Sequence, residues 1–115
     1  MINFACKRFD LKEIIRCSFN LTKTEFEIML YLMKNSNKEF TSKEISKNLK
    51  IGLSTSQKSI NNLNKKKLIK RQQKNLSKGG YAFVYLIKDK SHLKKKIIDT
   101  TNTLIREIEE EVSKL

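Results

Sequence analysis

The stretch TSKEISKNLKIGLSTSQKSINNL, residues 41–63, contains two runs with helical spacing, joined by the short link Lys50–Gly52. In the first run, Thr41 and Glu44 have the spacing of a capping box, in which each side chain binds the backbone N–H of the other residue. The link is too short for anything except a sharp turn, and Gly52 is expected to take the backbone conformation that the turn needs. The stretch therefore predicts two helices separated by a sharp turn.

The second run is expected to form a helix over about residues 53–67 that is unusually polar for a small protein. Its inner face is narrow and consists of Ser56, Ile60 and Leu63, at spacings of four and three residues. We expect this helix to pack along one edge and to present the rest of its surface outward. The remaining positions include Ser54, Thr55, Gln57, Lys58, Asn61, Asn62 and Lys65.

Apolar periodicity and turn residues predict the elements on either side of this stretch. A second capping box, formed by Thr22 and Glu25, begins a helix with enough apolar residues to be central and buried. Two strands are expected over residues 68–87, with a Gly-rich turn at Lys78–Gly80 between them. Further helices are expected over residues 10–19 and from about residue 91 to residue 115, the second with a long amphipathic stripe.

The positive charge of the chain is concentrated in one segment. The whole sequence has 25 Lys and Arg against 12 Asp and Glu, a net charge of +13. Residues 41–80 hold 11 of the basic residues and a single acid, Glu44, whereas residues 1–40 and 81–115 are nearly balanced. A Lys-rich genome would raise the lysine content everywhere, so composition bias does not explain this pattern. A local basic segment of this kind is what the phosphate backbone of a nucleic acid attracts.

The sequence also indicates what the protein is not. It has one histidine, no grouping of Ser, His, Asp or Cys suited to nucleophilic catalysis, and no phosphate-binding Gly loop. Its two cysteines, Cys6 and Cys17, are not spaced like zinc ligands. No apolar run is long enough to span a membrane, and no secretory signal pattern is present. We therefore expect a cytoplasmic protein that is not an enzyme and uses no cofactor, metal or membrane.

The segment TSKEISKNLKIGLSTSQKSINNLNKKKLIKR, residues 41–71, resembles the helix-turn-helix of winged-helix transcription regulators. The order of the elements is similar to that of MarR-like and TrmB-like regulators common in archaea, and KGGYAFVY, residues 78–85, resembles their wing. The sequence departs from the pattern at Ser56, which replaces a branched apolar residue, and at Lys67, where a glycine often stands. No effector domain follows, so we do not expect a full-length TrmB-type sensor. The caps and core of the pattern stand at Thr41, Glu44, Ile45, Leu49, Ile51, Ser54, Ile60, Leu63, Leu68 and Ile69.

The resemblance implies an α+β fold, mainly α, with a winged helix-turn-helix domain over residues 21–88 and a two-stranded β wing. Residues 1–20 would form an N-terminal helical segment, and residues 89–115 a C-terminal dimerisation helix. It also implies double-stranded DNA as a partner, with the polar helix in the major groove and the wing on an adjacent groove or backbone. The expected DNA contacts are Ser54, Thr55, Gln57, Lys58, Asn61, Asn62 and Lys65 of the helix and Arg71, Lys74, Lys78 and Gly79 of the wing.

The expected DNA contacts divide by side-chain chemistry into base contacts and phosphate contacts. The amides of Gln57, Asn61 and Asn62 suit base edges, particularly adenine. The basic side chains suit phosphates, which set register and affinity more than sequence. Two simpler interpretations stay open. In the first, Asn61 and Asn62 are ordinary solvated residues of the helix surface; in the second, Gly79 serves only the hairpin turn.

The C-terminal helix has lysines at its N-terminal end and glutamates near its C-terminal end, so both clusters oppose the helix dipole. An antiparallel partner helix would set the lysines of one chain against the glutamates of the other, which predicts a homodimer. The alternative is a helix packed on its own domain with solvated end charges. The expected dimer interface contains Ile14, Ile15, Phe19, Ile97, Leu104, Ile108 and Val112. Cys6 and Cys17 are expected to be buried small hydrophobes, with a redox switch at the dimer interface as the alternative.

The sequence thus predicts a dimeric, sequence-specific DNA-binding transcription regulator. One alternative is a winged-helix module of the transcription machinery that binds protein, although such a module has no need for focused charge. The other is a nucleic-acid-binding or chromatin-like protein with little sequence preference, which only a test of base selectivity would separate. The operator, the regulated genes, the sign of regulation and any small-molecule effector are left open.

Overall fold

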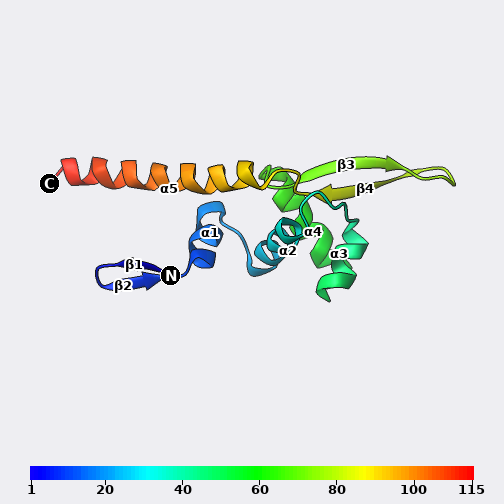
Figure 1. The fold of residues 1–115 in the computed structure, drawn as a ribbon, viewed down its shortest axis with the longest axis horizontal. Coiled ribbons are helices and arrows are strands. Elements are labelled where there is room, and N and C mark those ends of the chain that lie inside the picture. The colour runs from blue at the N-terminus through cyan, green and yellow to red at the C-terminus, as the bar shows by residue number, and fades with distance from the viewer. The chain divides into compact units, whose positions relative to one another are not determined.

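A computed structural model describes all 115 residues of the chain and divides it into two compact units. One unit comprises Leu21–Lys90, and the other combines Met1–Asn20 with Ser91–Leu115. The chain contains five helices and two small antiparallel hairpins. Figure 1 shows their order along the chain.

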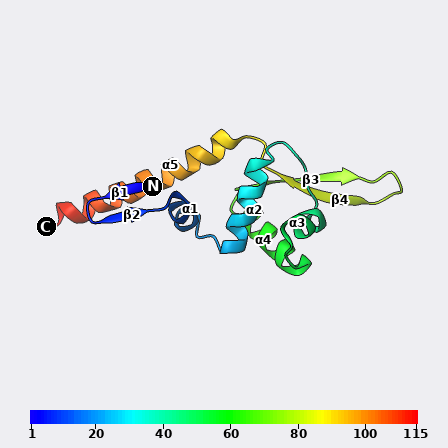
Figure 2. The ribbon, with the colours of Figure 1, turned by 60° about the horizontal axis from the view of Figure 1, so that its bottom comes forward.

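Three helices form the core of the unit Leu21–Lys90: α2 (Lys23–Lys34), α3 (Ser42–Leu49) and α4 (Leu53–Lys65). Figure 2 shows them grouped beside the second hairpin. Both predicted capping boxes are confirmed, one at the start of α2 and one at the start of α3. The side chains with no accessible surface come from all three helices and are Ile28, Met29, Leu32, Ile45, Ser56, Ile60 and Leu63.

The wing consists of β3 (Lys70–Asn75) and β4 (Tyr81–Leu86), paired antiparallel. Its turn closes through the backbone, where Leu76 N–H donates to the carbonyl of Gly80 over 3.0 Å. Gly79 and Gly80 have φ of +90° and +79°, values that favour glycine, so the predicted turn chemistry is confirmed. Figure 1 shows the hairpin extending beyond the helices of its unit.

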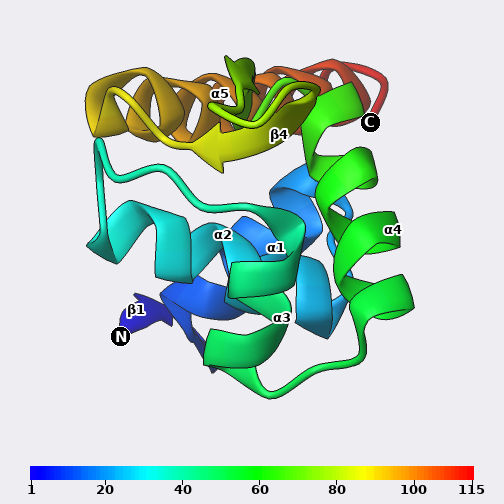
Figure 3. The ribbon, with the colours of Figure 1, turned by 90° about the vertical axis from the view of Figure 1, so that its right-hand side faces the viewer.

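A third segment pairs with the wing, and the sequence analysis did not predict it. Phe40 N–H donates to the carbonyl of Tyr85 at 3.1 Å, and Tyr85 N–H donates back at 2.8 Å. Asn37 N–H donates to Ile87 in the same way at 3.0 Å. These bonds join the loop between α2 and α3 to β4, which Figure 3 shows running alongside it. The base of the wing is therefore attached to the helical core by backbone hydrogen bonds.

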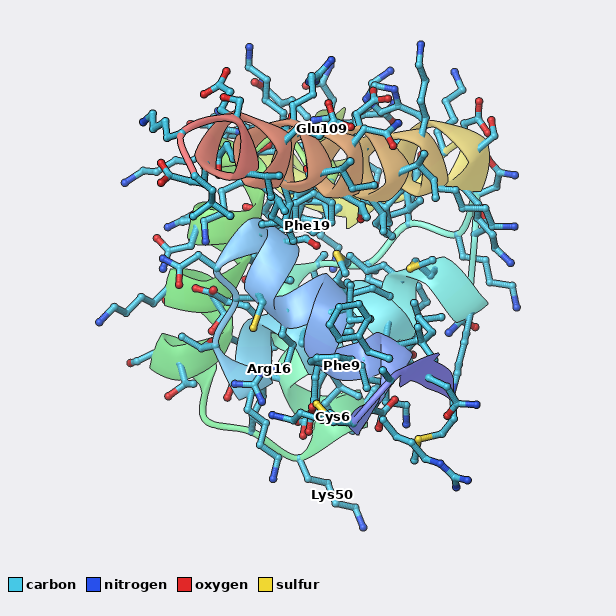
Figure 4. All side chains as sticks on the ribbon, turned by 90° about the vertical axis from the view of Figure 1, so that its left-hand side faces the viewer. Cys6, Phe9, Arg16, Phe19, Lys50 and Glu109 are labelled. Atoms are coloured by element: carbon cyan, nitrogen blue, oxygen red, sulfur yellow. The ribbon has the colours of Figure 1, made fainter.

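The turn between α3 and α4 corrects one prediction. Gly52 has a φ of −62°, which any residue adopts, and it serves as the N-cap of α4 without a side-chain cap bond. The left-handed residue is Lys50, the C-cap of α3, with a φ of +56°. Its side chain is exposed and points away from the fold (Figure 4). Gly52 was the expected site of a left-handed backbone, because glycine adopts that conformation without steric cost. In the structure the left-handed residue lies two positions earlier in the turn.

The departure of Lys67 from the regulator pattern has a similar explanation. Lys67 has a φ of +60° in the turn between α4 and β3. Glycine adopts this left-handed conformation without steric cost, and in this chain a lysine adopts it instead. Helix α4 consequently ends at Lys65, slightly before the predicted end.

The other unit contains β1 (Ile2–Phe4), β2 (Lys7–Phe9), α1 (Leu11–Phe19) and α5, which runs from Lys90 to Ser113. Asp10 is the N-cap of α1, and its Oδ1 accepts the N–H of Lys12 at 3.1 Å. The hairpin β1–β2 was not predicted.

The cysteine prediction is wrong. Cys6 lies in the turn of the hairpin β1–β2, and Cys17 lies on α1. Both thiols are free and exposed rather than buried. Figure 4 shows the position of Cys6 beside the hairpin. An isolated short hairpin has little apolar material with which to bury a thiol.

Lys50→Gly is expected to stabilise the fold. Glycine removes the steric cost of the left-handed backbone, and the exposed lysine side chain contributes no packing, so the free energy of unfolding should rise by roughly 0.5–1 kcal/mol. Lys50→Ala is the matched control, because it removes the same charge but keeps a Cβ. Urea unfolding of the three proteins measures the effect, and equal gains for glycine and alanine would contradict the backbone explanation.

Candidate functional site

Helix α4 has one buried side and one outward side. Its buried residues are Ser56, Ser59, Ile60 and Leu63, of which the sequence predicted all except Ser59. Among the predicted contact residues, Asn62 is half-buried. The exposed ones are Ser54, Thr55, Gln57, Lys58, Asn61 and Lys65.

A buried hydrogen bond explains how the polar side chain of Ser56 is accommodated on the inner face of α4. The side chain has no accessible surface, and its Oγ donates to the backbone carbonyl of Ser42 at 3.0 Å. Ser42 is the first residue of α3, so this bond joins α4 to the start of the preceding helix. A buried hydroxyl without a partner would cost free energy, and this one has its partner.

Glu25 joins α4 to α2. Only 3% of the residue is exposed, and its Oε1 accepts the backbone N–H of Thr22 at 3.0 Å within the capping box. Its Oε2 accepts a hydrogen bond from Asn62 Nδ2 at 2.9 Å. The ammonium group of Lys66 lies 4.0 Å from Oε1. The amide of Asn62 is therefore directed at Glu25 on α2.

A groove lies between α3, α4 and the base of the wing. The start of α3, the outward side of α4 and strand β4 each contribute to it. Gln57 and Asn61 thus share this groove with residues of the wing. Lys43 also lines the groove and was not predicted from the sequence. The only sequence feature that pointed to Lys43 was its position in the basic segment 41–80. The lining residues are Thr41, Ser42, Lys43, Gln57, Asn61, Ala82, Phe83 and Tyr85.

An aromatic pair supports one arginine of the wing. The guanidinium carbon of Arg71 lies 4.5 Å from the centre of the Phe83 ring, and the rings of Phe83 and Tyr81 are 5.4 Å apart, edge to face. In the register of the hairpin, Gln73 lies opposite Phe83 and Arg71 lies opposite Tyr85. These residues share one face of the wing because alternate residues of paired strands point the same way. The stacking restrains Arg71 while leaving its donors available.

The other predicted wing residues lie further along the hairpin. Lys74 Nζ is 3.2 Å from Glu39 Oε1, an ion pair in which both side chains are at least a third exposed and which contributes little to stability. Lys78 is exposed in the turn, and Gly79 has the positive φ that the turn requires. The structure thus gives Gly79 a clear role in the turn, and its contact with DNA stays a prediction.

The predicted dimer residues differ in their exposure. Leu104, Ile108 and Val112 are 55%, 53% and 58% exposed, and they line a shallow groove along α5 with Glu107, Glu111 and Leu115. The remaining four, Ile14, Ile15, Phe19 and Ile97, are half-buried within the chain. Figure 4 shows Phe19 and Glu109 in this unit.

No group of three or more His, Cys, Asp or Glu side chains is arranged to hold a metal ion. No helix is both long enough and apolar enough to cross a membrane.

Comparison with known proteins gives a family and a fold. The model of the DnaD N-terminal domain family matches residues 11–109. A solved structure, a possible transcriptional regulator from Methanosarcina mazei Go1, is 32% identical, with a TM-score of 0.92 and coverage of 99% of this chain and 95% of that one. A transcriptional regulator homologue from Pyrococcus horikoshii OT3 is 19% identical, with a TM-score of 0.56 and coverage of 85% and 95%. An uncharacterized protein of Methanocaldococcus jannaschii is 24% identical over 114 residues, 96% of this chain and 85% of that protein.

These likenesses confirm the predicted winged-helix fold, and they include proteins named as transcriptional regulators. The more specific resemblance to MarR-like and TrmB-like regulators stays a prediction.

Glu25→Ala is expected to lower the free energy of unfolding by roughly 2 kcal/mol, because it removes a cap and leaves the Asn62 amide without its partner. Glu27→Ala is the matched control, since Glu27 is exposed on the same helix and has the same charge. Urea unfolding should separate the two variants clearly. Similar unfolding midpoints and slopes for both would mean that Glu25 does not hold α2 to α4.

Proposed function

We propose that this chain, which belongs to the family of DnaD N-terminal domains, is a transcription regulator that binds double-stranded DNA as a homodimer. The observation that carries the proposal is the division of α4 into two sides. Its buried side is narrow and consists of two serines, Ile60 and Leu63, and its outward side presents hydroxyl, amide and ammonium groups within the segment that holds nearly all of the net charge. Such a helix suits a major groove, where base edges and phosphates need those groups.

The contacts follow from position and chemistry. Helix α4 would lie in the major groove, where Gln57 and Asn61 reach base edges. Lys58 and Lys65 are exposed on the same helix and would neutralise phosphates. The wing would add phosphate or minor-groove contacts from its base, through Arg71, and from its turn. Lys43 joins this set because it lines the groove between α4 and the wing.

The names of similar proteins support a role in the regulation of transcription. The Methanosarcina mazei relative, which matches this chain over almost its full length, is named as a possible transcriptional regulator. A MarR-like or TrmB-like mode of action, with two half-sites read by two protomers, is the more specific form of the proposal.

Binding should be tested by titrating the protein with the DNA upstream of its own gene and with a scrambled duplex, at several salt concentrations. We expect tighter binding to the upstream DNA, with a difference that persists as salt rises, because base contacts depend less on counterion release than phosphate contacts do. Equal and steeply salt-dependent binding to both duplexes would favour a nucleic-acid-binding protein without sequence preference. No binding to either at low salt would contradict DNA binding and favour a protein-binding module.

A single substitution in the wing tests whether a lysine of the turn contacts a DNA phosphate. Lys78→Ala should weaken binding to all duplexes alike and reduce the slope of log K against log salt by about one, the value for one lost phosphate contact. Lys23→Ala removes the same charge from the exposed start of α2, outside the basic segment, and should leave the slope unchanged.

The homodimer part of the proposal rests on α5. Its C-terminal half exposes an apolar stripe at helical spacing, which includes Leu104, Ile108 and Val112. Lysines 94–96 and the glutamates at 107 and 109–111 lie at opposite ends of the helix, so an antiparallel second copy is complementary to it in charge. Burying the stripe against its own copy would remove it from water and offset the unfavourable charge–dipole arrangement.

Ile108→Asp is expected to shift the protein from dimer to monomer, because it places a charge in the middle of the apolar stripe. Thr103→Asp adds the same charge elsewhere on α5 and should leave the dimer intact. Sedimentation velocity at micromolar concentration measures both. A monomeric unsubstituted protein, or a dimeric Ile108→Asp variant, would contradict the proposed interface.

A further inference from the structure

Three amide side chains of the unit Leu21–Lys90 are hydrogen-bonded within the protein, and two on the outward side of α4 are not. Asn62 is bonded to Glu25, and Asn48 Nδ2 donates to the hydroxyl of Tyr31 at 2.9 Å. Asn35 Nδ2 donates to the backbone carbonyl of Tyr31 at the same distance. These amides are occupied within the protein. By contrast, Gln57 and Asn61 are exposed and form no hydrogen bond with another part of the chain.

The amides of Gln57 and Asn61 are placed as a pair. Gln57 and Asn61 lie four residues apart on α4, so they project from the same side of the helix, and both line the groove beside the wing. Four residues rise about 6 Å along a helix, which is close to the spacing of two successive base-pair steps, each about 3.4 Å. The pair therefore matches two bases on one strand that are separated by one base.

The backbone that carries this pair is held firmly in place. Ser56 and Ile60, the residues directly before Gln57 and Asn61, have no accessible surface. Ser56 is also bonded to the start of α3. Each of the two amides therefore extends from a fixed point of the helix, which reduces the ordering that a base contact would require.

The chemistry of an amide selects one base. In the major groove adenine presents an acceptor at N7 and a donor at N6, and a carboxamide offers one donor and one acceptor to match them. Guanine presents two acceptors there, which suit arginine or lysine, and cytosine presents a donor, which suits a carboxylate. Helix α4 contains no Arg, Asp or Glu. Its outward side is thus equipped for adenine, with Lys58 available for guanine or phosphate.

We infer that Gln57 and Asn61 determine sequence specificity by each binding an adenine, and that the preferred half-site contains two A·T pairs, one base pair apart from each other, where α4 enters the major groove. This inference rests on the proposed function, because it names the class of DNA that the same site reads. It assigns specificity to two residues and leaves affinity to the lysines and Arg71.

The first step of the test is to select bound duplexes from a randomised pool with the full-length protein. The dissociation constant for the best duplex is then compared with that for duplexes in which single A·T pairs become G·C. Replacing the same adenines by 7-deazaadenine removes the N7 acceptor and keeps the base pair. Each change from A·T to G·C at a read position is expected to weaken binding by roughly 5- to 150-fold, the range for losing one bidentate contact. The 7-deazaadenine duplexes should show a smaller loss at the same positions, because one of the two hydrogen bonds remains.

The variants Gln57→Ala and Asn61→Ala should lose this discrimination, each at its own position, while keeping the thermal unfolding of the unsubstituted protein. Lys78→Ala is the control, since it should weaken binding to every duplex and keep the ratio between them. If the protein binds DNA but selects no A·T pairs, or if both alanine variants keep the preference, the inference is wrong and the proposed function stands. If no duplex is bound at low salt, both are wrong.

Discussion

The carboxylate of Glu25 is the constraint on which the orientation of α4 depends. One oxygen closes the capping box at the start of α2, and the other holds the amide of Asn62 on α4. The residue is almost fully buried, so a missing partner would leave a desolvated group and cost more free energy than the bond itself contributes. Because Asn62 must face Glu25, the rotation of α4 about its own axis is fixed. Gln57 and Asn61 then face outward.

A second bond fixes α4 at its other end. Ser56 binds the carbonyl of Ser42, so the start of α4 stays close to the start of α3. The wing is attached independently, through the backbone pairing of Phe40 with Tyr85. Helix and wing therefore meet at one groove, formed by residues from α3, α4 and β4. The polar helix α4 is held in place because Ile60 and Leu63 are fully buried and the buried Ser56 is hydrogen-bonded. Its outward residues are exposed to solvent.

Much of this arrangement was predictable, because it follows local rules. The capping boxes at Thr22 and Thr41 and the Gly-rich turn of the wing depend only on residues close in sequence, and they appear as predicted. The inner face of α4 likewise follows from its periodicity. The features that were missed depend on partners distant in sequence. The pairing of Phe40 with β4 and the bond between Asn62 and Glu25 have no local pattern. The left-handed Lys50 was missed because Gly52, two residues further along the chain, gave the stronger signal.

The central claim is that two amides on α4 face DNA while a third is kept by Glu25. Two-dimensional ¹⁵N–¹H NMR spectra of the side-chain NH₂ groups, recorded during titration with a bound duplex, test it directly. The account predicts large shifts for Gln57 and Asn61, accompanied by backbone shifts along the wing, and little change for Asn62. Shifts confined to α5, or a large change at Asn62 with none at Gln57 and Asn61, would contradict it.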